Sequence, residues 1–153
     1  MRGIYLFGLL LALAVVFAFF TSVDKSSAAP SEVIESQEMN HPGIVAELIE
    51  CRRKKGVLTV KVRVKNTSSK AMRVTWGDVK KDVYLMDEEN QKKYFLLKDA
   101  EGEFIYSGAP WDVSANTSKL SWFKFPAPPA EITEITVILP EVAPFEDVPI
   151  EDK

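Results

Sequence analysis

The stretch Leu58-Thr59-Val60-Lys61-Val62-Arg63-Val64-Lys65-Asn66 decides the class of fold that the chain is expected to adopt. Apolar and polar residues alternate in it, so an extended backbone places its aliphatic side chains on one face and its polar ones on the other. At about 3.3 Å per residue the segment is roughly 30 Å long, enough to cross a domain. We therefore predict a half-buried β-strand at the centre of a sheet.

Outside this stretch, the chain has the pattern of many short strands separated by turn-forming residues, and it shows no convincing amphipathic helix. A pattern of about eight strands at roughly ten-residue spacing is typical of two packed antiparallel sheets. We predict an all-β fold, an antiparallel two-sheet immunoglobulin-like sandwich formed by residues 43–153. The other strands are expected at 44–51, 72–76 (returning antiparallel to 58–66), 83–86, 93–97, 103–107, 120–125 and 131–139, with 144–150 as an edge strand or extended cover.

Three connections have a distinctive composition. The run Arg52-Arg53-Lys54-Lys55-Gly56 ends in glycine and is expected to be a solvated hairpin turn, with contact to an anionic surface as the alternative. Residues 107–118 are expected to form a long loop, a length typical of functional loops. The segment Pro126-Ala127-Pro128-Pro129 favours a polyproline-like crossover, because proline donates no backbone hydrogen bond.

The first 28 residues resemble an export sequence. Arg2 is followed by an uncharged apolar run over residues 3–23 and then by the small residues Ser26-Ser27-Ala28-Ala29. This is the order of a secretory signal peptide, and 21 uncharged residues are also enough for an uncleaved membrane anchor. Either alternative places the remaining chain outside the cytoplasm, periplasmic or secreted, with membrane contact only through residues 3–23. Residues 29–42 are polar and aperiodic, and are expected to be a flexible linker.

Charge and cysteine content exclude several classes of function. The chain has 19 basic and 22 acidic residues and a net charge of −3, whereas nucleic-acid binding requires clustered positive charge. Cys51 is the single cysteine, so the fold has no internal disulfide. His41 is the single histidine and lies in the expected linker. We therefore expect no catalytic residues, no cofactor and no zinc site, because such sites need several convergent side chains.

Four segments resemble a known family. They are L-T-V-K-V-R-V-K-N-T (58–67), Y-L-M-D-E-E-N-Q-K-K-Y-F-L-L-K-D-A-E-G (84–102), F-K-F-P-A-P-P-A-E-I-T-E-I-T-V-I-L-P (123–140) and P-F-E-D-V-P-I (144–150). Together they resemble secreted or envelope-anchored bacterial immunoglobulin-like domains of unknown function, some of whose members are labelled as similar to a telomere-repeat-binding factor. The resemblance covers about residues 44–150. It implies a fold and a location, and it supplies no catalytic residues.

Two groups of residues are candidates for a binding site. Trp111 lies in a Gly- and Pro-containing loop, and with Asp112 and Tyr106 it is the candidate partner-binding group. We expect a non-enzymatic module that binds an envelope or extracellular protein; the alternative is a carbohydrate-binding module in which Trp111 stacks on a sugar. Asp99, Glu101 and Glu103 around Gly102 are a possible calcium site, although their spacing does not match the twelve-residue calcium loop.

Overall fold

The computed structural model describes residues 32–107 and 111–153, and this part of the chain is all-β with antiparallel sheets. The predicted signal or anchor segment 1–28 lies outside the described residues. Among those that are described, no helix is long and apolar enough to span a bilayer. Residues 58–66 lie within β3 (Val57–Asn66), which is hydrogen-bonded between β2 (Ile44–Lys54) and β8 (Ser118–Pro126). The prediction of a central strand is therefore confirmed.

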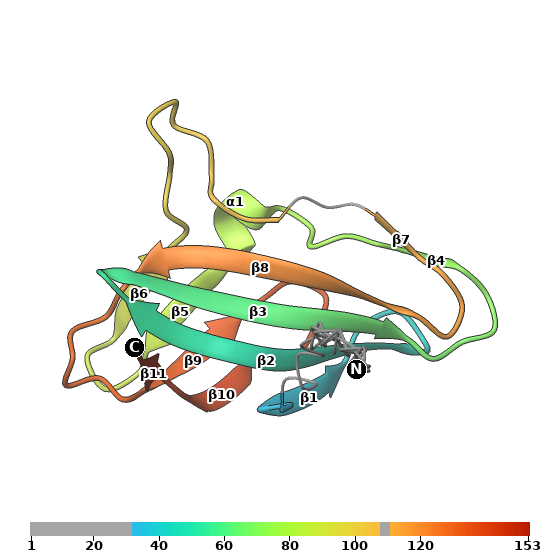
Figure 1. Cartoon of the computed structure of the whole chain (residues 1–153), viewed down its shortest axis with the longest axis horizontal. Coiled ribbons are helices and arrows are strands. Elements are labelled where there is room, and N and C mark those ends of the chain that lie inside the picture. Colours follow the sequence, from blue (N-terminus) through green and yellow to red (C-terminus); the bar gives the residue numbers. More distant parts are fainter. Residues whose placement is uncertain (1–31, 108–110) are drawn as a thin grey trace, which may run out of the picture.

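Two sheets face one another across one hydrophobic core (Figure 1). The five-stranded sheet has the order β1-β2-β3-β8, with β1 at Glu35–Glu38, and β11 (Glu151–Asp152) pairs in parallel with β2. The four-stranded sheet has the order β10-β9-β5-β6. Its strands are β10 (Phe145–Pro149), β9 (Glu134–Ile138), β5 (Tyr84–Asp87) and β6 (Lys92–Phe95).

The alternation of β3 explains how the core is filled. Leu58, Val60, Val62 and Val64 are fully buried, because they all lie on the face that is turned toward the second sheet. From β8, Phe123 packs edge-on against Trp76 with ring centroids 5.7 Å apart. The polar face of β3 points outward and forms ion pairs with β2, such as Arg63 with Glu47 at 2.7 Å. Burial of aliphatic and aromatic side chains is thus the main stabilising contribution.

The stretch 29–42, predicted to be a flexible linker, contains strand β1. Glu35 to Glu38 pair antiparallel with β2, and Met39 is buried and forms a bridge with Val142. A polar sequence can form this strand because β1 is an edge strand, which is stabilised through its backbone and exposes every second side chain to solvent. The structured domain therefore begins before residue 43.

The run of four cations was predicted to be a turn, and that prediction is wrong for its first three residues. β2 continues through Arg52, Arg53 and Lys54, and only Lys55 and Gly56 form the turn to β3. The period of two continues through the run, so Arg53 faces inward and is only 8% exposed. Its guanidinium is satisfied there by hydrogen bonds, which are described below.

The predicted pairing of 72–76 with β3 is also wrong. β4 (Met72–Val74) pairs instead with β7 (Trp111–Val113), inside the stretch that was expected to be a loop. Both edges of β3 are already occupied by β2 and β8, so a third partner cannot add to it. The turn that leads away from β3 is fixed by the buried Asn66, whose amide donates to the carbonyl oxygens of Lys70 and Val113.

Shorter differences affect three other elements. The expected strand 103–107 forms only isolated bridges, and a hairpin-like segment within residues 96–107 projects above β8 (Figure 1). The expected strand 131–139 is regular only within β9. A single helical turn, α1 (Val79–Asp82), connects β4 to β5 and has Asp78 as its N-cap. The prediction for 144–150 is confirmed, because β10 is an edge strand of the four-stranded sheet.

Candidate interaction surface

The three predicted partner-binding residues have different environments. Tyr106 is half-buried and stacks on Phe123, with ring centroids 6.4 Å apart, so it packs against the core. Asp112 is exposed on β7 and forms an exposed ion pair with Arg73 at 3.7 Å. The backbone of Trp111 pairs with Val74, while its side chain lies outside the described residues. Of the three residues, Asp112 has an exposed side chain and Tyr106 packs partly against the core.

The acidic turn predicted as a possible calcium site is closed by its own backbone. Asp99 Oδ1 accepts hydrogen bonds from the backbone N–H groups of Glu101 (3.1 Å) and Glu103 (2.8 Å). One carboxylate oxygen thus serves as a turn cap, a common role of aspartate in loops. In the described part of the chain, no group of three or more His, Cys, Asp or Glu side chains is arranged to hold a metal ion.

Cys51 and Asn66 are inaccessible in the folded domain; Asn66-Thr67-Ser68 and Asn116-Thr117-Ser118 fit the N-glycosylation pattern Asn-X-Ser/Thr. The Cys51 side chain is fully buried, and burial, followed by the nearby negative charge of Glu151, raises the pKa of its thiol to about 12. Asn66, in Asn66-Thr67-Ser68, is also fully buried, and its amide is engaged in the hydrogen bonds described above. Neither side chain can react at the surface of the folded domain.

An apolar row on the outer face of the four-stranded sheet is the strongest candidate for a binding surface. Phe95 of β6 is directly opposite Tyr84 of β5, and Tyr84 is directly opposite Ile138 of β9. Directly paired residues share one face of a sheet, so the three side chains form a row across three strands. Phe95 is 50% exposed, and the other two are half-buried.

The neighbouring row extends this surface. Met86 is opposite Lys93 on one side and Thr136 on the other. The Lys93 ammonium lies 4.2 Å from the centroid of the Tyr84 ring, a cation–π contact. We call Phe95, Tyr84, Ile138, Met86 and Lys93 the outer-sheet surface.

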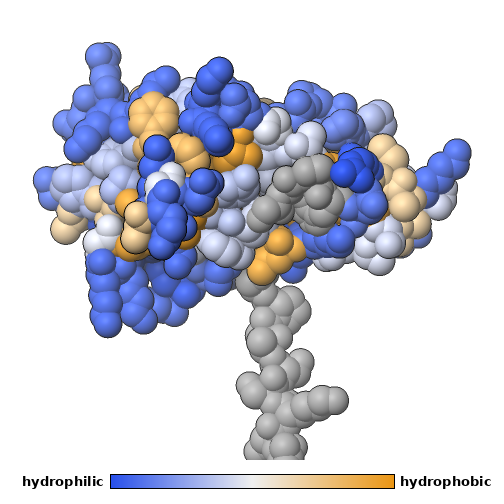
Figure 2. Space-filling view, turned by 90° about the horizontal axis from the view of Figure 1, so that it is seen from above, coloured by the Kyte–Doolittle hydropathy of each residue, from blue (hydrophilic) through white to orange (hydrophobic). Residues whose placement is uncertain are grey.

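Large exposed apolar side chains are rare elsewhere in the described structure. Phe95, Leu120 and Val33 are its exposed large hydrophobic residues, and they lie in β6, in β8 and in the segment before β1, respectively. The space-filling view shows mainly hydrophilic side chains on the described part of the face that it presents, with small groups of hydrophobic ones between them (Figure 2). Of these three residues, Phe95 is the one with an aromatic residue, Tyr84, directly opposite it, and Tyr84 in turn is opposite the aliphatic Ile138.

The sequence does indicate this surface, but a search for alternating apolar and polar residues does not find it. Val83-Tyr84-Leu85-Met86 and Tyr94-Phe95-Leu96-Leu97 are continuous apolar runs, not alternating ones. A strand whose two faces are both apolar is expected to be covered on both sides. The inner row, formed by Tyr94, Leu85 and Val137, is buried in the core, whereas the outer row is only partly covered.

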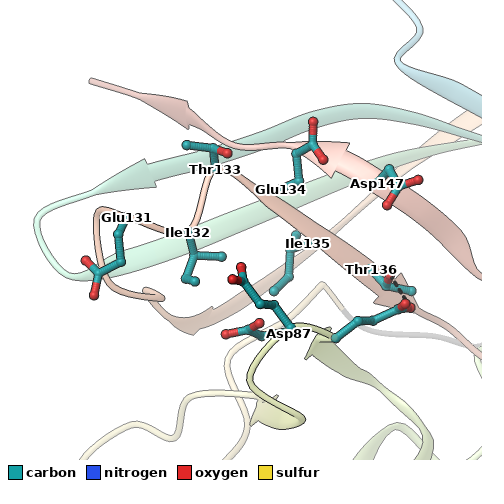
Figure 3. Close-up of a pocket in the computed structure, with 10 residues that line it drawn as sticks. Asp87, Glu131, Ile132, Thr133, Glu134, Ile135, Thr136 and Asp147 are labelled. Atoms are coloured by element: carbon teal, nitrogen blue, oxygen red, sulfur yellow. Dashed lines mark hydrogen bonds between the residues drawn. The ribbon is translucent and has the colours of Figure 1, made fainter.

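An acidic pocket lies at the end of the same sheet, with a volume of about 200 Å³ (Figure 3). Asp87 is buried and accepts hydrogen bonds from the backbone and side chain of Asn90, while Glu88 accepts one from Thr136. The labelled carboxylates of Glu131, Glu134 and Asp147 point in different directions (Figure 3). The arrangement makes this end of the domain acidic without directing these carboxylates at one point.

Comparison of the chain with models of protein families, with characterised proteins and with solved structures gives no match.

Proposed function

We propose that the chain is an exported, non-enzymatic immunoglobulin-like module that binds another protein at the cell envelope. The leader-like composition of residues 1–28 supports export. Two antiparallel sheets around one core, between which the chain passes several times, support the immunoglobulin-like assignment. The family resemblance of residues 44–150 is consistent with both.

One observation carries the binding proposal: the cross-strand row of Phe95, Tyr84 and Ile138 faces outward. Burying such a row in a complex removes apolar area from water, at about 25 cal/mol per Å². Aromatic residues are also enriched among the side chains that dominate the energy of protein interfaces. Lys93 adds a charged group at the edge of the row, where it can contribute to specificity.

The test compares substitutions of two residues that are exposed to a similar extent. The chain carrying Phe95→Ser is expected to lose the partner that the wild-type chain captures from envelope extract, as measured by quantitative mass spectrometry. The matched control is Leu120→Ser, because Leu120 is 53% exposed but lies on β8 in the other sheet. Equal capture by wild type and Phe95→Ser, or loss of capture with both variants, would contradict the proposal.

Carbohydrate binding is the second candidate, and the neighbouring rings of the half-buried Tyr84 and the exposed Phe95 are the observation that favours it. Their rings lie 5.9 Å apart and are inclined at 47°. Aromatic side chains at a surface can stack on sugar rings. Saturation-transfer NMR with envelope polysaccharide distinguishes the two candidates, because protein binding predicts no transfer to the glycan. Transfer that Phe95→Ser abolishes would favour the carbohydrate module.

A further inference from the structure

The edge of β2 opposite β3 is covered by two short strands. β1 pairs with Val45–Leu48, and β11 pairs in parallel with Arg52 and Arg53. β11 has two residues, and both are exposed. Segments with few backbone contacts have low local stability in a fold. The edge at residues 52–54 is therefore covered by a strand of low local stability.

Arg53 is positioned at this edge by contacts that do not involve β11. Nη1 donates to the carbonyl oxygens of Pro128 (3.1 Å), Pro129 (2.5 Å) and Ile132 (3.1 Å), and Nη2 donates to that of Ala130 (3.3 Å). These four bonds fix the plane of the guanidinium. Its remaining edge, formed by Nε and Nη2, is the fork that binds a carboxylate with two parallel hydrogen bonds.

The C-terminal residues show which chemistry fits this edge. Asp152 accepts from Nε at 2.6 Å and from Nη2 at 2.8 Å, and Glu151 lies 3.6 Å from the Arg52 guanidinium. Ile150 packs against the core and donates its backbone N–H to the Thr133 carbonyl oxygen at 2.8 Å. The occupant is thus an extended segment with an aliphatic residue followed by two acidic ones.

We propose that this edge of β2 is a strand-addition site for an extended segment of another protein with the same aliphatic–acidic–acidic pattern, and that β11 is its internal competitor. The site adds a second contact to the proposed protein-binding function and does not use the outer-sheet surface. Recognition combines main-chain pairing with β2 and the two carboxylate contacts. A tethered strand has a high effective concentration, so it blocks weak ligands until it detaches.

The test uses the full chain and the peptide acetyl-Pro-Ile-Glu-Asp-Lys, which copies residues 149–153. The double variant Glu151→Gln/Asp152→Asn weakens the internal strand but retains Arg53. In ¹⁵N NMR titrations, the peptide is expected to shift the amide signals of residues 52–54 in this variant. The wild-type chain is expected to bind the peptide roughly tenfold more weakly, because β11 competes for the site.

Two controls make the outcome specific. Acetyl-Pro-Ile-Gln-Asn-Lys is expected to bind the double variant roughly tenfold more weakly than the acidic peptide, because it lacks the charge-assisted bonds. Phe95→Ser is expected to leave peptide binding unchanged, so failure at this edge is distinguishable from failure of the outer-sheet proposal.

Three results would overturn the inference. The first is equal affinity of the double variant for both peptides. The second is that the peptide shifts amide signals of residues outside β2 and not those of residues 52–54. Both apply to a variant whose spectrum shows a folded chain. The third is a wild-type dimer in sedimentation experiments that the double variant abolishes, because the edge would then bind a second copy of the chain. If the double variant does not fold, the titration is made on the wild-type chain with excess peptide. Equal affinity of the wild-type chain for both peptides, or shifts only of signals away from β2, would then overturn the inference.

Discussion

Arg52 and Arg53 show that two adjacent residues of the same type can have opposite environments in a strand. Arg52 and Arg53 are neighbours in a run of cations, but the alternation of β2 places Arg52 outside and Arg53 inside. The inward guanidinium is retained because four carbonyl oxygens and Asp152 replace the hydrogen bonds that it would make with water. The hydrogen bond to the Arg53 guanidinium in turn lowers the pKa of the Asp152 carboxyl.

Replacing Arg53 tests this description. Arg53→Lys is expected to lower the free energy of unfolding by about 2 kcal/mol, because lysine cannot reproduce the fork and the carbonyl contacts together. Urea unfolding followed by tryptophan fluorescence measures the change. Arg73→Lys is the control, since Arg73 is exposed and its substitution is expected to change stability by less than about 0.5 kcal/mol. Equal effects of the two substitutions would show that the buried contacts contribute nothing specific.

Cys51 gives a prediction about pH. Its thiol has a pKa of about 12 in the folded chain against 9.0 for the unperturbed group, so the unfolded chain loses this proton first as pH rises. Above pH 9, this group therefore lowers the free energy of unfolding by about 1 kcal/mol per pH unit. Below pH 9, it has no effect on the free energy of unfolding. We expect Cys51→Ala to remove this part of the decline in stability between pH 9 and about pH 11. Parallel declines in the wild type and the variant would contradict the burial of the thiol.

The elements differ in how far their sequences specify them. β3 is predictable because its residues alternate strictly, and its inner face is buried as expected. β1 is not predictable from its own sequence, because its residues are polar. Its stability comes from pairing with the β2 backbone and from the buried Met39. The partner of β4 depends on the occupied edges of β3, which are formed by strands distant in sequence. Local patterns therefore predict strands better than their pairing.

Met39 tests whether the segment before residue 43 belongs to the domain. Met39→Ala is expected to reduce the free energy of unfolding by about 3 kcal/mol, because it leaves a cavity where a buried side chain packed. Val33→Ala is the control, since Val33 is 40% exposed and its loss is expected to cost less than about 0.5 kcal/mol. A flexible linker would instead make both substitutions neutral in thermal unfolding.

The environments of the residues singled out from the sequence could not be predicted from it. Asp112 is exposed, Tyr106 packs on Phe123 and Asp99 caps a turn. Phe95 was missed because a residue in a strand pattern is normally assigned to the core, and exposure depends on which strands pair. The uninterrupted apolar run 83–86 was the available signal, since only one of its faces can point into a single core.

The whole molecule combines a filled interior with an incompletely covered outer face. The inner faces of both sheets share one core, whereas the row of Phe95, Tyr84 and Ile138 lies on the opposite side of the four-stranded sheet. Stability thus comes from the inner faces, and recognition is proposed to use the outer one. A substitution at Phe95 is therefore expected to affect binding without unfolding the domain.

Photo-crosslinking in intact cells tests the outer-sheet surface most directly. With p-benzoylphenylalanine at position 95, irradiation is expected to join the chain to a specific envelope protein, because the side chain at this position faces the proposed partner. The same group at position 120, which is exposed to a similar extent on the other sheet, is expected to give no such product. Crosslinks from position 120 and none from position 95 would contradict the proposed binding surface.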